Sequence, residues 1–146
     1  MKKPIGILLL FVMSLFMSNE ALAHCQIPCG IYNDNMRIMM MDEHITTIEK
    51  SMRLVEELSV DPSNNMNQIV RWVNNKEQHA DEFTKIVTYY LLAQRTKAPE
   101  STRGSDYETY QAQLETLHQM MVAAMKAKQT TDQLHIGQLR TLLKEF

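Results

Sequence analysis

The residues best suited to chemistry lie close together near the start of the chain, in residues 24–32. This segment holds both cysteines of the chain, Cys25 and Cys29, and His24 directly precedes the first. Thiolates, imidazole and deprotonated amide nitrogens all bind metal ions. If the mature chain began at His24, it would add a primary amine with a pKa of about 7.7–8.0. The segment therefore predicts a metal site.

The donor groups suggest both the geometry and the metal. The amine of His24 with the amide nitrogen and sulfur of Cys25 can close two fused chelate rings. Cys29 can return a second sulfur, because Pro28 and Gly30 favour a bend, and the His24 ring could bind axially. A tetragonal N2S2 set selects Cu(II) or Ni(II) over tetrahedral Zn(II). Thiolates tend to reduce Cu(II), so nickel is favoured, with one-electron transfer through a Ni(III)/Ni(II) couple as the chemistry.

The preceding residues predict how His24 would become the first residue. Lys2 and Lys3 precede an apolar run at 5–17, and residues 21–23 read Ala-Leu-Ala. This is the layout of a secretory signal peptide, and the run is shorter than the roughly 20 residues of a membrane span. We expect 1–23 to be a cleaved signal peptide and the protein to be exported, periplasmic or extracellular. An uncleaved anchor or a buried helix is the alternative.

The rest of the chain predicts an all-α fold. Apolar residues recur every three or four positions, which is typical of amphipathic helices. We expect an antiparallel four-helix bundle at 34–146, preceded by a metal-binding hook at 24–33. The first two expected helices cover about 34–58 and 63–93, and a loop follows at 96–104. The last two helices are expected to begin at capping boxes that start at Ser105 and Thr130.

The expected apolar stripes define a candidate core. On the first helix they are Ile38, Met41, Ile45, Ile48, Met52 and Val55, and on the second Met66, Ile69, Val70, Val73, Ala80, Phe83, Val87 and Tyr90. On the third they are Tyr107, Tyr110, Leu114, Leu117, Met121 and Ala124, and on the last Leu134, Leu139, Leu142 and Leu143.

Charge and length limit the partners. The chain has 146 residues and a formal net charge of −2 at pH 7. This balance does not indicate a nucleic acid or an anionic membrane as partner. After processing we expect one domain and no membrane association.

Residues 24–32 match a known motif. They read His24-Cys25-x-x-Pro28-Cys29-Gly30-x-Tyr32, which resembles the H-C-x-x-P-C-G-x-Y nickel hook of nickel superoxide dismutase. The resemblance implies disproportionation of superoxide to O₂ and H₂O₂ by a Ni(II)/Ni(III) cycle, with one nickel ion per subunit held by His24, Cys25 and Cys29. It also implies that Tyr32 lines the access to the metal and that subunits form a homohexamer.

Several positions depart from the family pattern. Better-known members orient the axial imidazole with a glutamate on the first helix and an arginine on the second. Our alignment places Met40 and His79 there, and Glu43 is a candidate to replace the glutamate by a different route. A second tyrosine near the substrate channel has only Tyr89 and Tyr90 as candidates.

Two other readings of the hook stay open. The cysteines could form a small disulfide loop, although so short a ring removes little loop entropy. The hook could also belong to an exported copper or nickel carrier without catalysis.

Other candidate residues have two interpretations each. A methionine cluster at 36–41 could bind Cu(I) through thioethers or simply pack in the core or an interface. Arg37 could attract an anionic substrate or be an ordinary surface residue. The remaining histidines are expected to be satisfied or exposed helix residues: His44, His79, His118 and His135.

Overall fold

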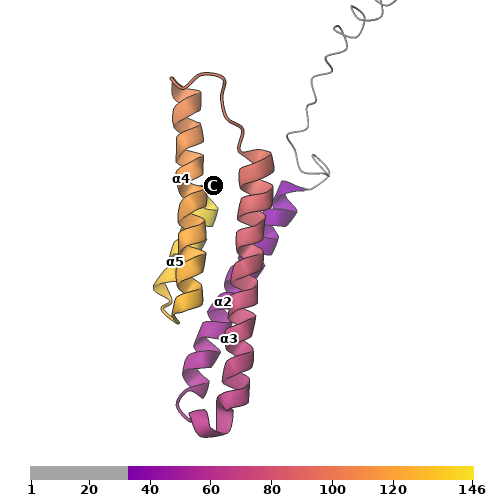
Figure 1. Ribbon diagram of the computed structural model, residues 1–146, viewed down its shortest axis with the longest axis vertical. Helices are drawn as coiled ribbons and strands as arrows, with labels where there is room; N and C mark the ends of the chain where they lie inside the picture. The colour runs from indigo at the N-terminus through magenta and orange to yellow at the C-terminus, as the bar shows by residue number, and fades with distance from the viewer. Residues whose placement is uncertain (1–32) are drawn as a thin grey trace, which may run out of the picture.

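Helices dominate residues 33–146, the part of the chain that this computed structural model describes (Figure 1). In chain order they are α2 (Asp34–Leu58), α3 (Pro62–Lys85), η1 (Ile86–Arg95), α4 (Ser105–Gln129) and α5 (Leu134–Glu145). Because η1 continues α3 without a break, the described residues form four helices and no strand. The all-α four-helix prediction is confirmed. The hook, and the proposed boundary at residues 23–24, lie outside the described residues.

The helices pack as two antiparallel hairpins. α2 packs along α3 and α4 along α5, while α3 contacts α4 and α2 contacts α5. The α2–α3 hairpin extends beyond the α4–α5 pair at the end where α2 turns into α3 (Figure 1). The opposite end carries the start of α2 and the η1–α4 loop, so the residues before Asn33 join the bundle there.

The core follows the predicted stripes over most of their length. Buried side chains come from every helix, and burial of each large one contributes roughly 1.5–3 kcal/mol. The largest fully buried apolar side chains are Phe83, Met41, Ile45, Ile48, Met52, Leu117, Met120, Leu139 and Val87. One continuous core therefore links all four helices.

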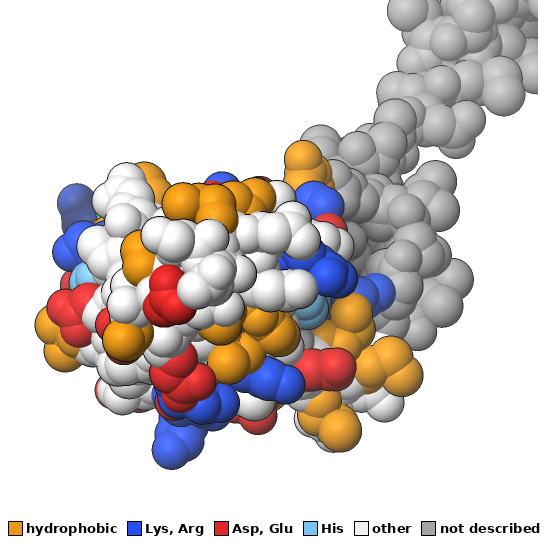
Figure 2. Space-filling view, turned by 90° about the horizontal axis from the view of Figure 1, so that it is seen from below, with side chains coloured by type: hydrophobic (Ala, Val, Ile, Leu, Met, Phe, Trp, Pro, Cys, Tyr) orange, Lys and Arg blue, Asp and Glu red, His pale blue; other side chains and the backbone are white. Residues whose placement is uncertain are grey.

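The stripe prediction is wrong at the first turns of α3. Met66 is 57% exposed and Val70 is 50% exposed. These residues lie on the overhanging part of the hairpin, where α4 and α5 do not reach. Figure 2 views the molecule from this end and shows hydrophobic side chains scattered among charged ones. Leu134, at the first turn of α5, is likewise 61% exposed.

The second predicted helix is divided in the structure. It changes at Ile86 into the π-helix η1, whose last turn is closed by the Thr96 N–H donating to the Leu91 carbonyl at 2.9 Å. A π-helix bonds each residue to the fifth along the chain and is often found near functional sites. A search for an α-helical period cannot detect this change.

Both predicted capping boxes are wrong, although helices begin close by. Ser105 is the first helical residue of α4, and Gly104 precedes it as N-cap with a φ of 95°, which favours glycine. Thr130 is the C-cap of α4. The start of α5 is held instead by Asp132, whose Oδ1 accepts the Leu134 N–H at 2.9 Å.

A buried lysine ties the two hairpins together. Lys76 of α3 is 4% exposed, and its Nζ donates to the carbonyls of Lys128 at 2.7 Å and Thr130 at 2.9 Å. These carbonyls end α4 and lack helical partners, and a cation is favoured at a helix C-terminus. Burial lowers the pKa of Lys76, opposed by the nearby charge of Glu77.

Candidate metal centre

The predicted ligands and the predicted channel residue all lie outside the described residues. His24, Cys25, Cys29 and Tyr32 precede Asn33, where the described structure begins. What the structure shows is the base to which this segment is attached. Among the described residues, no group of three or more His, Cys, Asp or Glu side chains is arranged to hold a metal ion.

Asn33 starts the bundle with a cap. Its side-chain Oδ1 accepts the N–H of Met36 at 3.3 Å, which satisfies one of the free donors at the start of α2. The described structure therefore begins at a capped helix terminus.

A three-residue cluster fixes the start of α2 to the end of η1. Asp34 accepts a hydrogen bond from the Tyr90 hydroxyl and forms an ion pair with Arg95. We call these residues the Asp34 cluster. Burial raises the pKa of Tyr90, and its hydrogen bond to Asp34 raises it further, so the hydroxyl remains a donor at neutral pH. The cluster therefore fixes the end of α2 that follows residues 24–32 in the chain.

The π-helix explains how two side chains reach the same carboxylate. Tyr90 and Arg95 are five residues apart, and in an α-helix such residues point about 140° apart around the axis. In η1 the hydrogen bonds join residues five apart, which brings side chains at this spacing closer together. Both can then contact Asp34.

A second cation lies over the same tyrosine. The guanidinium of Arg37 lies 5.4 Å from the centre of the Tyr90 ring and also donates to the Met40 sulfur at 3.8 Å. Arg37 and Arg95 therefore bring positive charge to the base of the hook.

A small cavity of about 350 Å³ adjoins the Asp34 cluster. It is lined by Asp34, Arg95, Ile38, Leu91, Leu143 and Phe146. The last residue of the chain therefore lies close to the first residue of α2.

The methionine cluster divides between core and surface. Met41 is fully buried, while Met36 is 60% and Met39 is 72% exposed. Met40 is half-buried against the core. The packing interpretation therefore holds for Met40 and Met41, and the exposed pair lines a surface hollow of about 750 Å³ with Glu43.

The four scattered histidines have different surroundings. His44 and His79 face one another across α2 and α3, with their Nδ1 atoms 2.9 Å apart. The Nδ1 of His135 lies 3.1 Å from Gln138 Oε1, and His118 is exposed. The pairing of His44 with His79 was missed from the sequence, because each was considered on its own helix.

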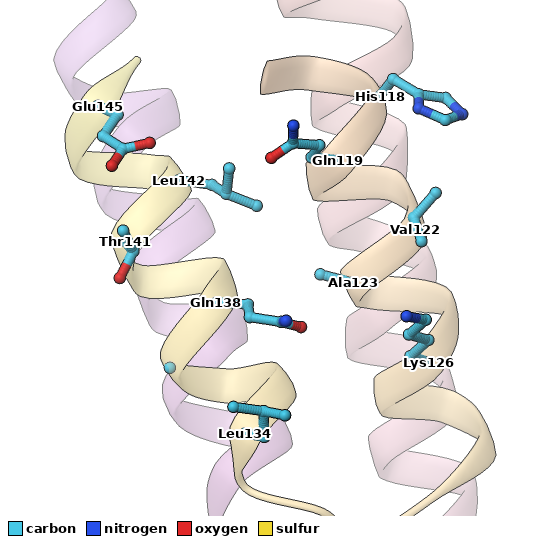
Figure 3. A pocket seen from close by; sticks show the side chains of 11 residues that line it. His118, Gln119, Val122, Ala123, Lys126, Leu134, Gln138, Thr141, Leu142 and Glu145 are labelled. Carbon is cyan, nitrogen blue, oxygen red and sulfur yellow. The ribbon is translucent and has the colours of Figure 1, made fainter. Parts of the chain in front are cut away.

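A groove of about 690 Å³ lies between α4 and α5, away from the predicted site. In Figure 3, Leu142 and Gln138 of α5 point toward α4, whereas the ring of His118 points away from α5. Its lining combines apolar and amide side chains with His118, Lys126 and Glu145.

No helix within residues 33–146 has both the length and the apolar character needed to cross a membrane. The chain is a four-helix, all-α protein that carries the H-C-x-x-P-C-G-x-Y motif in the sequence ahead of α2. The model of the nickel-containing superoxide dismutase family matches residues 19–146, and the chain belongs to that family. Searches of curated proteins and of solved structures return no match.

Family membership settles the activity. The protein is a nickel-dependent superoxide dismutase, and its substrate is superoxide. Its cofactor is nickel. The matched range includes the entire H-C-x-x-P-C-G-x-Y motif. Nothing in the match favours the non-catalytic carrier.

Proposed function

We propose that this enzyme binds one nickel ion per chain through the N-terminal amine of His24, the amide nitrogen and thiolate of Cys25, and the thiolate of Cys29. The His24 imidazole completes the set. The proposal is supported by the donor chemistry, because nitrogen and thiolate ligands in a tetragonal arrangement suit Ni(II). The residues present therefore fit the metal that the family requires.

Bound nickel supplies the one-electron chemistry by which two superoxide ions and two protons become O₂ and H₂O₂. The chain must attract the anion, limit access to the metal and hold the ligands in place. We assign the access role to Tyr32, which lies two residues before Asp34. Arg37 and Arg95 support the attraction of superoxide, because positive charge near a site raises the local concentration of an anionic substrate.

The Asp34 cluster is proposed to hold the base of the hook. A ligand segment positions its metal well only when it departs from a rigid element. Asp34 joins α2 to η1 through Tyr90 and Arg95, and Asn33 caps the same helix. These contacts would keep the origin of the hook fixed while the metal changes oxidation state.

Processing is proposed to generate the His24 amine. Cleavage after Ala23 would place the protein in the periplasm or outside the cell and would expose the amine in a single step. Intact mass of the protein secreted from its native host tests this. A mass that includes residues 1–23 in active enzyme would contradict it.

A homohexamer is proposed for the assembly. Exposed Met36 and Met39 beside the base of the hook, and the groove between α4 and α5, offer apolar surface that a second copy could cover. Light scattering after size-exclusion chromatography tests this, and a monomeric active enzyme would refute it.

The ligand assignment is tested by replacing one sulfur at a time. Cys25→Ser and Cys29→Ser should each abolish dismutase activity and lower the nickel content of the processed protein, with the helical circular dichroism unchanged. One extra residue before His24 should do the same, because it turns the amine into an amide. Retained activity in either serine variant would refute the assignment. A wild-type protein that binds copper preferentially and shows no turnover would point to the carrier.

A further inference from the structure

The α2–α3 hairpin carries a pair of imidazoles, neither of which is among the proposed nickel ligands. His44 of α2 and His79 of α3 approach with their Nδ1 atoms 2.9 Å apart. Their ring centres are 5.1 Å apart and the planes are inclined by 56°. Both side chains are half-buried. Two ring nitrogens therefore face each other across a helix interface.

The spacing of these nitrogens suits a bound transition metal. Metal–imidazole bonds are about 2.0–2.1 Å long, so two nitrogens at a right angle about one ion are about 2.9 Å apart. In the metal-free pair, the Nδ1–H of one ring donates a hydrogen bond to the Nδ1 of the other. A metal ion can replace that proton once both rings turn so that their Nδ1 lone pairs point to the same ion.

The surroundings favour the neutral, ligand form of the pair. Burial lowers the pKa of His44, and the neighbouring His79 lowers it further. The carboxylates of Glu82 and Glu43 act on His44 in the opposite direction, so negative charge lies within range of any bound cation. Metal binding requires deprotonated imidazole and gains from nearby negative charge.

Two imidazole nitrogens are donors that suit Cu(II) among the divalent first-row ions. Because only two strong ligands are fixed, water would complete the coordination and the ion would exchange.

We propose that His44 and His79 form a second metal site, between α2 and α3, which binds Cu(II) in preference to Ni(II) and Zn(II). The order of preference follows the stability series for divalent ions at nitrogen ligands, in which copper is the strongest binder. The site shares no ligand with the hook.

The test uses full processed protein already loaded with nickel. Copper sulfate is titrated at pH 7.5, with copper and nickel content measured and the Cu(II) electron paramagnetic resonance spectrum recorded. We expect one bound Cu(II) per chain with imidazole nitrogen couplings and no loss of nickel. His44→Gln and His79→Gln should each weaken copper binding by about 10-fold or more. His118→Gln, on the exposed face of α4, should leave it unchanged.

A second measurement does not depend on variants. In nitrogen-15 spectra of the wild-type side chains, substoichiometric Cu(II) should broaden the His44 and His79 ring signals before those of His118 and His135. Equal broadening of all four would overturn the proposal. So would copper uptake that only displaces nickel, or unchanged affinity in both glutamine variants. None of these outcomes bears on dismutase activity, so the hook assignment is tested separately.

Discussion

Replacing Tyr90 with phenylalanine removes one hydroxyl from the Asp34 cluster and leaves the buried ring in place. A hydrogen bond to a charged partner contributes about 1.5–3 kcal/mol. Asp34 is 49% exposed, which places the expected loss in the free energy of unfolding near the lower end, about 1.5 kcal/mol. For a domain of this size, that corresponds to a fall in Tm of roughly 6 °C.

Arg95→Gln should lower the free energy of unfolding by less than Tyr90→Phe does, although Arg95 carries a full charge. Its side chain is 48% exposed, and ion pairs in solvent contribute about 0–1 kcal/mol. Added salt at 0.5 M should weaken the Arg95 effect and leave the Tyr90 effect nearly unchanged, because screening acts mainly on exposed charges.

Urea unfolding of the processed, nickel-free protein measures both variants under the same conditions. Tyr89→Phe is the matched control, because Tyr89 is the neighbouring residue and is 58% exposed. We expect this control to change stability by less than about 0.5 kcal/mol. An equal loss for Tyr89→Phe and Tyr90→Phe, or a larger loss for Arg95→Gln, would refute the reasoning.

Two further predictions concern the hairpin α2–α3. Lys76→Met should lower the free energy of unfolding by about 2 kcal/mol, because two helix-terminal carbonyls lose a charged donor. Thermal unfolding measures this loss. Lys144→Met, at an exposed position of α5, is the control and should have little effect. The lowered pKa of His44 means that the unfolded chain binds the proton more readily, so stability should fall as pH drops below about 6.5 and stay level above it. With Glu43, Glu82 and His79 left in place, His44→Gln should flatten the pH dependence of stability between pH 7 and 5. An unchanged pH slope in that variant would contradict the attribution of this dependence to His44.

The fold was predictable because helical periodicity survives in a single sequence. The stripe from Met41 to Met52 is buried as expected, since its residues belong to the core that all four helices share. Exposure of Met66 and Val70 could not be predicted, because it depends on how far α4 and α5 reach along α3. The change to a π-helix at Ile86 is equally hidden, since it alters hydrogen bonding and leaves composition unchanged.

The site was predictable only in its local part. Residues 24–32 carry a motif that is contiguous in the sequence, and the family match includes it. The contacts at the start of α2 join residues that are distant along the chain. Asp34 contacts Tyr90 and Arg95, which lie in η1, more than 50 residues later. Such pairs depend on the register between helices, which periodicity on each helix does not specify. His44 and His79 were overlooked for the same reason.

The position of Phe146 has a practical consequence for producing the enzyme. An affinity tag ahead of the metal-binding segment would block the amine on which it is proposed to depend. A tag after Phe146 would emerge next to Asp34 and Arg95, which share a cavity with that residue. The turn between α2 and α3, where Val60 is 87% exposed, lies at the opposite end of the molecule (Figure 1). Purification handles and fluorescent labels belong in that turn.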